Sequence, residues 1–343
     1  MTASNQAEPK LQLGPFQGIT DVWYRIAFQK YFNGIDQFFT AFFSGIHTDN
    51  SKNLHTPEID PNLNPVDKLI PQLLSNNADE ALRFAQQINA MGFTEMNLNM
   101  GCPYPLVARK KRGSGILPYP DIVKQLLEIL SAYGKIRYSV KCRLGYEQHH
   151  EIDQLIPLFN QYGLNQLIIH ARIGKQLYKG SPLTEEFGRI HKRIIPELVY
   201  NGDIFSVETY LKLSKKFPAV QSWMLGRGLL SDPFLAADIK KQAGTIHSVQ
   251  RLQTVEKFLQ EIYYLRRTHS RDNLNTLGRM KELWSYLRYS FDDEQQVWRL
   301  VKRVKTFEEY ENAVSEVMKS NQWIGKGYQR KLDKEEQDKT QYP

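Results

Sequence analysis

Side chains of four kinds in this 343-residue sequence could take part in chemistry: a thiol, an amine, an imidazole and several amides. Cys102 follows NLNMG (97–101), a place that suits either a reactive thiol or a small hydrophobic residue packed in a turn. Lys141 and His170 lie within the apolar stretches IRYSVKCRL (136–144) and QLIIHAR (166–172). A lysine directed inward is rarely buried without an anionic partner, so Lys141 favours a site for an anionic ligand.

These residues belong to a regular alternation of short strands and helices. Eight strands are predicted, at 11–14, 36–43, 69–74, 95–100, 136–144, 166–172, 197–203 and 222–228. Helical spacing separates them, for example over 78–92 and in segments that begin at Asp121, Glu151, Ser206 and Asp232. This alternation within about 240 residues predicts an α/β fold, a (β/α)8 TIM barrel. An open doubly wound sheet is the alternative.

Strand parity brings the polar residues together. Side chains alternate across a strand, which places these sets on shared sides: Ile70, Gln72 and Leu74; Asn97 and Asn99; Lys141 and Arg143; Ile168, His170 and Arg172. Cys142 would then pack outward, under a helix. Taken singly, His170 could be a hydrogen-bonded core residue, and Gln72 or Asn99 could stabilise a turn. Their convergence at the carboxyl ends of the strands, where barrel active sites lie, favours a polar ligand instead.

Two glycine-containing turns indicate what that ligand carries. Asn201, Gly202 and Asp203 follow the seventh strand, and Gly226, Arg227 and Gly228 follow the eighth. The loops after these strands form the usual phosphate site of the fold, where glycines allow backbone N–H groups to approach and an arginine neutralises charge. A flavin mononucleotide or a sugar phosphate would fit, although GRG alone also suits a plain loop.

Four regions are expected along the chain. They are a disordered N-terminus (1–10), the barrel (11–243), a small all-α helical domain (244–325) and a disordered charged tail (326–343). In the helical domain, 248–267, 273–291 and 294–318 read as helices, and the last carries a basic helical stretch at 299–305.

Charge favours an anionic macromolecule as partner. The formal net charge is +8 and the isoelectric point about 9.2. The run ARKKR supplies Arg109, Lys110, Lys111 and Arg112 just past Cys102, and with Arg266, Arg267, Arg271 and the 299–305 stretch it makes a plausible footprint for RNA. Two cysteines form no disulfide framework, no metal cluster is evident, and no segment resembles a signal peptide or membrane span. A cytoplasmic monomer without metal is expected.

Seven ordered motifs make the chain resemble the tRNA-dihydrouridine synthases, flavoproteins with an FMN-bearing barrel followed by a helical domain. The motifs are GPFQGITD (14–21), PQLL (71–74), NLNMGCP (97–103), VKCRLG (140–145), IHAR (169–172), NGDI (201–204) and GRG (226–228). The resemblance implies that FMN is held by Pro15, Phe16, Gln17, Gln72, Lys141, His170, Asn201, Gly202, Asp203, Gly226 and Arg227. Where the family usually has Ala-Pro-Met, this chain has Gly14, Pro15 and Phe16, so an aromatic ring would replace a thioether beside the flavin.

The resemblance also implies a reaction. The enzyme would reduce the 5,6 double bond of a uridine in the D loop of tRNA, with NADPH reducing FMN and Cys102 donating a proton to carbon 5. A thiol suits this step because it is mostly protonated at neutral pH yet can release its proton to an enolate. Lys141 and Arg172 would stabilise negative charge on flavin or uracil, and Asn97, Asn99, Arg172 and residues 109–112 would contact the substrate RNA.

Three questions stay open at this stage. Residues 279–288 resemble the tail of the C-type bacterial branch, whereas residues 101–115 are less like it. A flavin-dependent oxidoreductase of a small pyrimidine-like substrate would share the barrel and the cysteine, but it would not explain the basic helical domain. A non-catalytic RNA-binding barrel would explain the charge without the chemistry.

Overall fold

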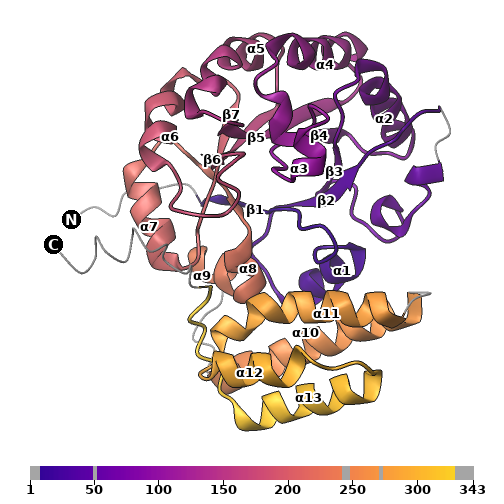
Figure 1. Ribbon diagram of the computed structural model, residues 1–343, viewed down its shortest axis with the longest axis vertical. Coiled ribbons are helices and arrows are strands. Elements are labelled where there is room, and N and C mark those ends of the chain that lie inside the picture. The colour runs from indigo at the N-terminus through magenta and orange to yellow at the C-terminus, as the bar shows by residue number, and fades with distance from the viewer. Residues whose placement is uncertain (1–7, 49–51, 242–247, 270–272, 329–343) are drawn as a thin grey trace.

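The barrel is closed. The computed structural model describes residues 8–48, 52–241, 248–269 and 273–328. Its parallel strands follow one another in chain order around the barrel, and β1 pairs with both β2 and β8, which excludes an open sheet (Figure 1). The strands are β1 (Lys10–Leu13), β2 (Gln37–Phe43), β3 (Leu69–Leu73), β4 (Glu95–Met100), β5 (Arg137–Gly145), β6 (Gln166–Ile173), β7 (Glu197–Asn201) and β8 (Ser222–Leu225).

Helices surround the barrel, and local capping signals mark several of their ends. They are α1 (Val22–Tyr31), α2 (Ala78–Ala90), α3 (Pro105–Ala108), α4 (Pro120–Tyr133), α5 (Ile156–Gln161), α6 (Thr184–Ile190), α7 (Val207–Lys216), α8 (Arg227–Ser231) and α9 (Leu235–Ile239). Asn77 caps α2 by accepting a hydrogen bond from the Glu80 backbone N–H, and Ser206 caps α7 in the same way. The helices expected from Glu151 and Asp232 begin later, because a 3-10 turn (His149–Gln154) precedes α5 and Asp232 lies outside α9.

The barrel wall separates two apolar layers. Inside the barrel, Phe39, Ile70, Ile168, Val199 and Met224 form a buried cluster. Outside it, a larger core lies between strands and helices and includes Cys142, which is fully buried. The outward packing predicted for Cys142 is therefore confirmed. Register supports the predicted parity too, since Asn99 of β4 lies beside Lys141 of β5, and Asn97 beside both Ser139 and Gln72.

The C-terminal helices are α10 (Ser248–His269), α11 (Asn273–Leu287), α12 (Glu294–Val301) and α13 (Phe307–Ser320). The single helix expected over 294–318 is wrong, and so is the basic helix over 299–305. Thr306 starts a new helix, because its side chain accepts a hydrogen bond from the Glu309 N–H while Glu309 accepts one from the Lys305 N–H. These two hydrogen bonds mark the break between α12 and α13. The basic residues 299–305 thus occupy a helix end and a turn, where they remain exposed.

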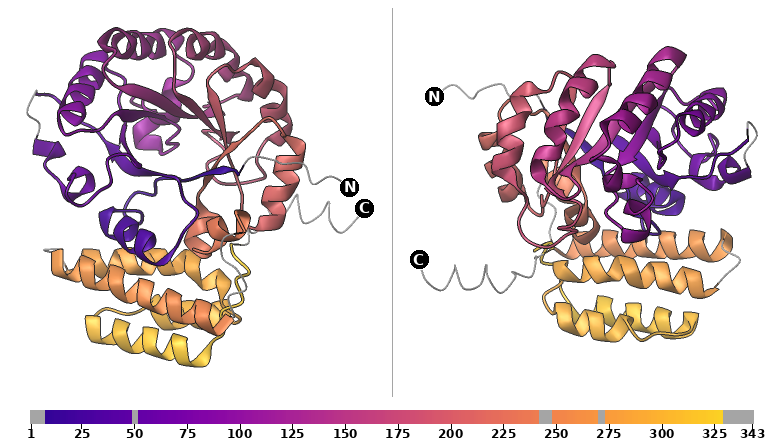
Figure 2. Two further views of the ribbon diagram at one scale, coloured as in Figure 1. Left: turned by 180° about the vertical axis from the view of Figure 1, so that it is seen from behind. Right: turned by 45° about the horizontal axis from the view of Figure 1, so that its top comes forward.

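The helical domain packs against the side of the barrel formed by α1 and α8 (Figure 2). Phe28 of α1 and Phe32, the residue that follows α1, pack against Phe258 of α10, with ring centroids 6.5 and 4.9 Å away. The core is therefore continuous between the two parts. The expected domain boundary at 243/244 lies outside the described residues, as do residues 1–7, Arg271 and 329–343. Residues 326–328, expected to begin a disordered tail, return to the barrel.

Length and apolar character decide whether a helix in the described part of the chain could span a membrane. None of its helices combines the length and the apolar character that a bilayer crossing requires.

Candidate active site

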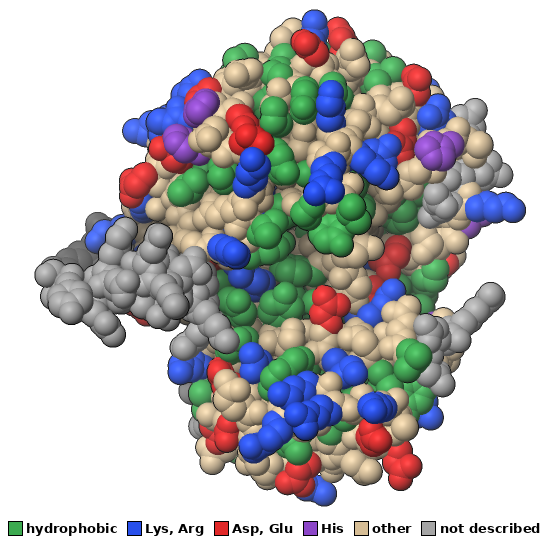
Figure 3. All heavy atoms as spheres, viewed as in Figure 1, with side chains coloured by type: hydrophobic (Ala, Val, Ile, Leu, Met, Phe, Trp, Pro, Cys, Tyr) green, Lys and Arg blue, Asp and Glu red, His purple; other side chains and the backbone are tan. Residues whose placement is uncertain are grey.

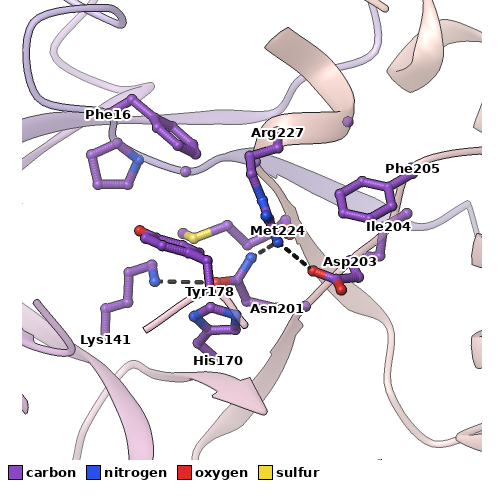
Figure 4. A pocket seen from close by; sticks show the side chains of 15 residues that line it. Phe16, Lys141, His170, Tyr178, Asn201, Asp203, Ile204, Phe205, Met224 and Arg227 are labelled. Atoms are coloured by element: carbon purple, nitrogen blue, oxygen red, sulfur yellow. Dashed lines mark hydrogen bonds and ion pairs between the residues drawn. The ribbon is translucent and has the colours of Figure 1, made fainter. Parts of the chain in front are cut away.

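Two adjoining cavities open at the carboxyl ends of the strands. One, here called the β7–β8 cavity, has an empty volume of about 490 Å3 and is lined mainly by residues at the ends of β1, β7 and β8 (Figure 4). The other, the Cys102 cavity, has an empty volume of about 650 Å3 and is lined from β1 to β6. Both are lined by Pro15, Phe16, Lys141, His170 and Tyr178. Because they share these residues, they form one mouth.

All of the residues expected to bind FMN line this mouth. Gln17 and Gln72 belong to the Cys102 cavity, Asn201 to Asp203, Gly226 and Arg227 belong to the β7–β8 cavity, and the remainder are shared. Residues from strands far apart in sequence are thus brought together, as the strand-end pattern predicts. Of the residues expected at the substrate, Cys102 and Asn99 line the mouth, whereas Asn97 and Arg172 do not.

Lys141 projects from β5 to the boundary between the cavities. Its Nζ donates a hydrogen bond to Asn201 Oδ1 at 3.1 Å, and Asn201 is itself fixed by donating to the Met224 carbonyl at 2.9 Å. Burial of the amine, with a further contribution from the nearby Arg143, lowers the pKa of Lys141 to about 8. Lys141 is therefore still mostly charged at neutral pH, but its charge is weakly compensated. An anionic ligand would satisfy it.

His170 is neutral in this setting. Burial lowers its pKa well below the ordinary value, and the cations Arg143, Lys141, Arg172 and Arg227 lower it further. The His170 Nε2 lies 3.0 Å from an N–H group of Arg172. A guanidinium can only donate, so Nε2 accepts and Nδ1 carries the proton. His170 therefore offers a hydrogen-bond donor at Nδ1 without a charge.

Arg172 lies behind the cavity wall rather than in it. It is fully buried and donates to both carboxylate oxygens of Asp203, at 2.8 and 2.6 Å, and to the Gly180 carbonyl at 2.6 Å. The expected contact of Arg172 with flavin or uracil is thus not what the structure shows, because these partners hold its guanidinium. Instead, Arg172 positions His170 and Asp203.

Asp203 joins the second arginine to this group. Its Oδ1 also accepts a hydrogen bond from Arg227 at 2.6 Å, so one carboxylate is shared between Arg172 and Arg227. Arg227 begins α8 and lines the β7–β8 cavity. Asp203 has a left-handed backbone (φ 46°) after Gly202, which turns the chain sharply at the end of β7. Figure 4 shows Asp203 and Arg227 side by side at one end of the cavity, away from Lys141.

Cys102 is held in the other cavity by its backbone. Asn99 Oδ1 accepts hydrogen bonds from the N–H groups of Gly101 and Cys102, at 3.0 and 2.9 Å. The Cys102 carbonyl accepts from both the backbone N–H and the hydroxyl of Ser114, at 2.9 and 3.1 Å. The segment after β4 therefore folds back on itself, and the partly exposed Cys102 lines the cavity.

A row of amides inside the barrel supports Asn99. Its Nδ2 donates to Gln72 Oε1 at 2.7 Å, Gln72 Nε2 donates to Asn97 Oδ1 at 2.8 Å, and Asn97 Nδ2 donates to Ser139 Oγ at 2.9 Å. Asn97 is fully buried beneath the mouth. The expected contact of Asn97 with substrate is corrected accordingly, because strand parity fixes the side of a residue but not its depth. Asn97 supports Gln72 instead.

Sequence reasoning did not assign Tyr178 and Arg143 to the site. Tyr178 lies in the loop after β6, and its ring centroid is 6.0 Å from that of His170 and 5.0 Å from Arg227 Cζ. Arg143 donates to the Gly101 carbonyl at 3.0 Å and so helps to hold the Cys102 segment. Strand parity places Arg143 inward, which is a usable signal in the sequence. No period or motif marks Tyr178, since it lies in an irregular loop.

The basic run past Cys102 is divided in its contacts. Arg109 and Lys110 are exposed, and Lys111 lies over the Tyr119 ring at 4.3 Å. Arg112 is tied to Asn76 at 3.2 Å and to Glu80 at 3.5 Å. Figure 3 views the face with the mouth and shows Lys and Arg side chains around it and over the helical domain. The run thus offers Arg109, Lys110 and Lys111 to a partner, whereas Arg112 is structural.

The other predicted RNA-binding arginines of α10 are engaged within the protein. Arg266 is buried and paired with Asp21, with Nε 3.1 Å from Oδ2. Arg267 is paired with Glu311 at 2.9 Å, although about half of its side chain stays exposed. Arg266 therefore joins the two domains and is not part of the surface predicted to bind RNA.

The charges of the mouth fit a phosphate-bearing cofactor. Among the described residues that line the cavities, Asp203 is the only carboxylate, whereas Lys141, Arg143 and Arg227 are cations. Aromatic rings of Phe16, Tyr178 and Phe205 add flat apolar surface. A planar, anionic ligand matches both features, and FMN is such a ligand.

Comparisons with known proteins find a matching family model, similar sequences and a similar fold. The family model of dihydrouridine synthase (Dus) matches residues 12–322. A tRNA-dihydrouridine(16) synthase of Neisseria meningitidis serogroup A is 29% identical over 320 residues, covering 90% of this chain and 94% of that protein. The serogroup B protein of the same name is 27% identical over 325 residues, covering 92% and 96%. The structure of histamine dehydrogenase from Rhizobium sp. 4-9 shares the fold, with a TM-score of 0.50, 10% identity, and coverage of 74% of this chain and 49% of that one.

Proposed function

The chain belongs to the dihydrouridine synthase family, and we propose on that basis that it reduces the 5,6 double bond of a uridine in the D loop of tRNA. The observation that carries the proposal is the shared mouth. Cys102 lies in one cavity, the paired Asp203 and Arg227 lie in the other, and Lys141 lines both. A thiol beside a site for an anionic planar cofactor suits a reduction completed by proton transfer.

The cofactor would be FMN. Arg227 and the turns at Gly202 and Gly226 would hold its phosphate, while Gln72, Lys141 and the Nδ1–H of His170 would bond the edge of its ring system. When bound and reduced by NADPH, FMN supplies the hydride that carbon 6 of uracil receives. Phe16 lines both cavities and would offer an aromatic contact beside the ring.

The residues of the Cys102 cavity would complete the reaction. Hydride addition at carbon 6 leaves negative charge on carbon 5 and its neighbouring carbonyl oxygen. The Cys102 thiol would donate its proton to carbon 5, and the Lys141 ammonium would stabilise the oxygen. The Asn99 amide and the Arg143 guanidinium keep the Cys102 segment in place during this step.

The target base would leave the RNA stack to reach the cavity, which costs a few kcal/mol. The exposed Arg109 and Lys110 lie just past Cys102 and would contact phosphates at the rim. Arg299, Lys302, Arg303 and Lys305 of the helical domain are exposed and would add further contacts. Basic surface on both parts of the molecule is what a substrate of tRNA size requires.

The names of the two Neisseria relatives support a particular target. Both are called tRNA-dihydrouridine(16) synthases, and they match this chain over almost its whole length. We therefore propose uridine 16 of the D loop as the target.

The test supplies the purified protein with FMN, NADPH and an unmodified tRNA transcript, and maps dihydrouridine by mass spectrometry of nuclease fragments. We expect two added hydrogens at uridine 16 and no reduction of free uridine. Bound FMN without any dihydrouridine in tRNA would contradict the synthase function. Reduction of free uridine at a similar rate would favour a small-molecule oxidoreductase, and tRNA binding without flavin binding would favour a non-catalytic barrel.

A further inference from the structure

The last described residues of the chain return to the barrel. Residues 321–328, here called the C-terminal strap, leave α13 and run back toward α8 and α9 (Figure 1). The N–H groups of Ile324 and Gly325 donate to the Ser290 carbonyl, at 2.8 and 3.1 Å, and that of Gly327 donates to the Ser290 hydroxyl at 3.2 Å. The Trp323 ring packs against Phe291 with centroids 5.2 Å apart. The strap is thus fixed along the helical domain.

Its final residue is fixed to the barrel. The Tyr328 N–H donates to the Ser231 hydroxyl at 2.8 Å, and Ser231 ends the short helix that Arg227 begins. Gly327 lies so close to the loop after β7 that a Cβ added to it would be 2.8 Å from the Phe205 carbonyl oxygen. Gly327 also has a left-handed backbone (φ 71°). This close approach directs the Tyr328 ring toward the β7–β8 cavity.

The Tyr328 ring completes an aromatic enclosure around Arg227. The Arg227 Cζ lies 5.0 Å from the ring centroid of Tyr328, 5.0 Å from that of Tyr178 and 5.2 Å from that of Phe205. The rings of Tyr328 and Phe205 also contact each other, with centroids 4.9 Å apart. The guanidinium is therefore confined by three rings and by Asp203, which accepts one of its hydrogen bonds.

A second aromatic contact links the strap to the other end of the mouth. Tyr286 of α11 lies 6.1 Å from Tyr328 and 6.1 Å from Phe16, measured between ring centroids. Phe16 lines both cavities. The helical domain and its strap thus contact the cavity-lining residues Phe16 and Arg227.

We propose that Tyr328 is a positioning residue for cofactor binding, which holds Arg227 in the orientation that receives the cofactor's phosphate. The C-terminal strap is then part of the cofactor site, and retention of the cofactor depends on the docked helical domain. This inference rests on the proposed function, because it assumes that a phosphate-bearing flavin occupies the mouth. A ring above a guanidinium restricts its motion and excludes water without removing its hydrogen-bond donors, which is what phosphate binding needs.

The experiment uses the full-length protein freed of flavin and titrated with FMN, with quenching of flavin fluorescence as the readout. Riboflavin, which has the same ring system but no phosphate, is titrated in parallel. The variants are Tyr328→Ala, Tyr328→Phe, Arg227→Ala and the double variant Tyr328→Ala/Arg227→Ala. Tyr264→Ala is the matched control, because Tyr264 is an exposed tyrosine of α10. Circular dichroism confirms that each variant is folded.

We expect Tyr328→Ala to weaken FMN binding about tenfold while riboflavin binding changes by less than about twofold. Tyr328→Phe should bind FMN like the wild type, because the ring is retained. The double variant should bind FMN as weakly as Arg227→Ala alone, since Tyr328 acts through Arg227. Unchanged FMN binding by Tyr328→Ala, equal losses of FMN and riboflavin, or additive losses in the double variant would overturn the proposal. A wild-type protein that binds neither flavin would instead refute the proposed function, and this inference with it.

Discussion

One cysteine lines the mouth and the other is buried outside the barrel wall, so their replacement should have different effects on activity. Cys102 lines a cavity, whereas Cys142 is fully buried in the outer core, where burial raises its thiol pKa to about 12. Cys102→Ala should keep FMN and tRNA binding but lower dihydrouridine formation at least about 100-fold, because the proposed proton donor is missing. Single-turnover assays with unmodified tRNA measure this loss.

Cys142→Ala is the matched control for that prediction. It removes a thiol from β5, the strand next to β4, which Cys102 follows. The variant should leave turnover near the wild-type value. Its cost is a small cavity, worth about 1 kcal/mol in the free energy of unfolding. Wild-type turnover by Cys102→Ala, or equal losses for both variants, would remove Cys102 from the mechanism.

The charge of Lys141 predicts a pH dependence of cofactor binding. Burial lowers the pKa of this amine to about 8, so the unliganded protein loses the positive charge as the pH rises through that value. The charged ammonium is the stronger hydrogen-bond donor to the edge of the flavin ring, and it also attracts the anionic cofactor as a whole. The affinity for FMN should therefore fall above pH 8, by at most about tenfold per pH unit. FMN titrations between about pH 7 and 9.5 avoid the ionisation of the phosphate itself, near pH 6. Lys141→Met should bind FMN weakly at all these values, and a wild-type affinity that stays constant would contradict the assignment.

Arg172 and Asn97 show what strand parity can and cannot predict. Parity correctly places both inside the barrel, together with Lys141 and His170. It gives no depth along the strand, and Asn97 lies below the mouth, bonded to Gln72 and Ser139. For Arg172, the carboxylate of Asp203 comes from a different strand end, so only the folded structure reveals that the guanidinium is already occupied.

The element that carries Cys102 depends on a glycine. Gly113 has a left-handed backbone (φ 57°), and a Cβ at this position would lie 2.5 Å from the Cys102 carbonyl oxygen. Gly113→Ala should therefore displace the segment from 101 to 115 and lower dihydrouridine formation by more than about tenfold, since small misplacements of a reacting group are costly. The affinity for FMN, measured by fluorescence, should change little, because the proposed phosphate site at Arg227 lies in the other cavity.

Gly163→Ala separates the collision from backbone strain. Gly163 has a similar φ of 64°, but nothing lies within 4 Å of the position of its Cβ. Both variants should lose about 1 kcal/mol of stability from the left-handed backbone. Only Gly113→Ala should lose activity, and equal activity of the two would argue against a rigidly held Cys102.

The strands were predictable because their signal is local and repeated, whereas one helix boundary depended on a single residue. The apolar segments from 95 to 100 and from 166 to 172 match β4 and β6 within one residue. By contrast, the apolar stripe from Val297 to Val304 continues past the end of α12, and the period alone hides the break. The break follows from the Thr306 cap and its partner Glu309, a pattern that is present in the sequence but competes with the stripe.

At the scale of the whole molecule, one buried carboxylate joins the barrel to the helical domain. Asp21 caps α1 and accepts hydrogen bonds from Arg266 of α10, at 3.1 Å, and from Arg279 of α11, at 2.9 Å. Arg266 also donates to the Ile19 carbonyl at 2.6 Å. The GITD segment that continues from the cavity-lining residues Pro15 to Gln17 therefore ends at the domain interface. The proposed cofactor site and the interface with the helical domain therefore share one short segment of the chain.

This arrangement predicts that neutralising Asp21, the partner of Arg266 in α10, destabilises the protein far more than breaking the exposed ion pair of the next residue, Arg267. Asp21→Asn keeps a capping oxygen but leaves the buried Arg266 without its counter-charge, which should cost about 3–5 kcal/mol in the free energy of unfolding. Glu311→Gln is the control, because it breaks the pair with Arg267, whose side chains are about half exposed, and should cost at most about 1 kcal/mol. Urea unfolding followed by circular dichroism measures both values. Similar costs for the two variants would show that Asp21 does not hold the domains together. A large cost for Asp21→Asn should be accompanied by weaker FMN binding, because the strap that confines Arg227 docks with the same helical domain.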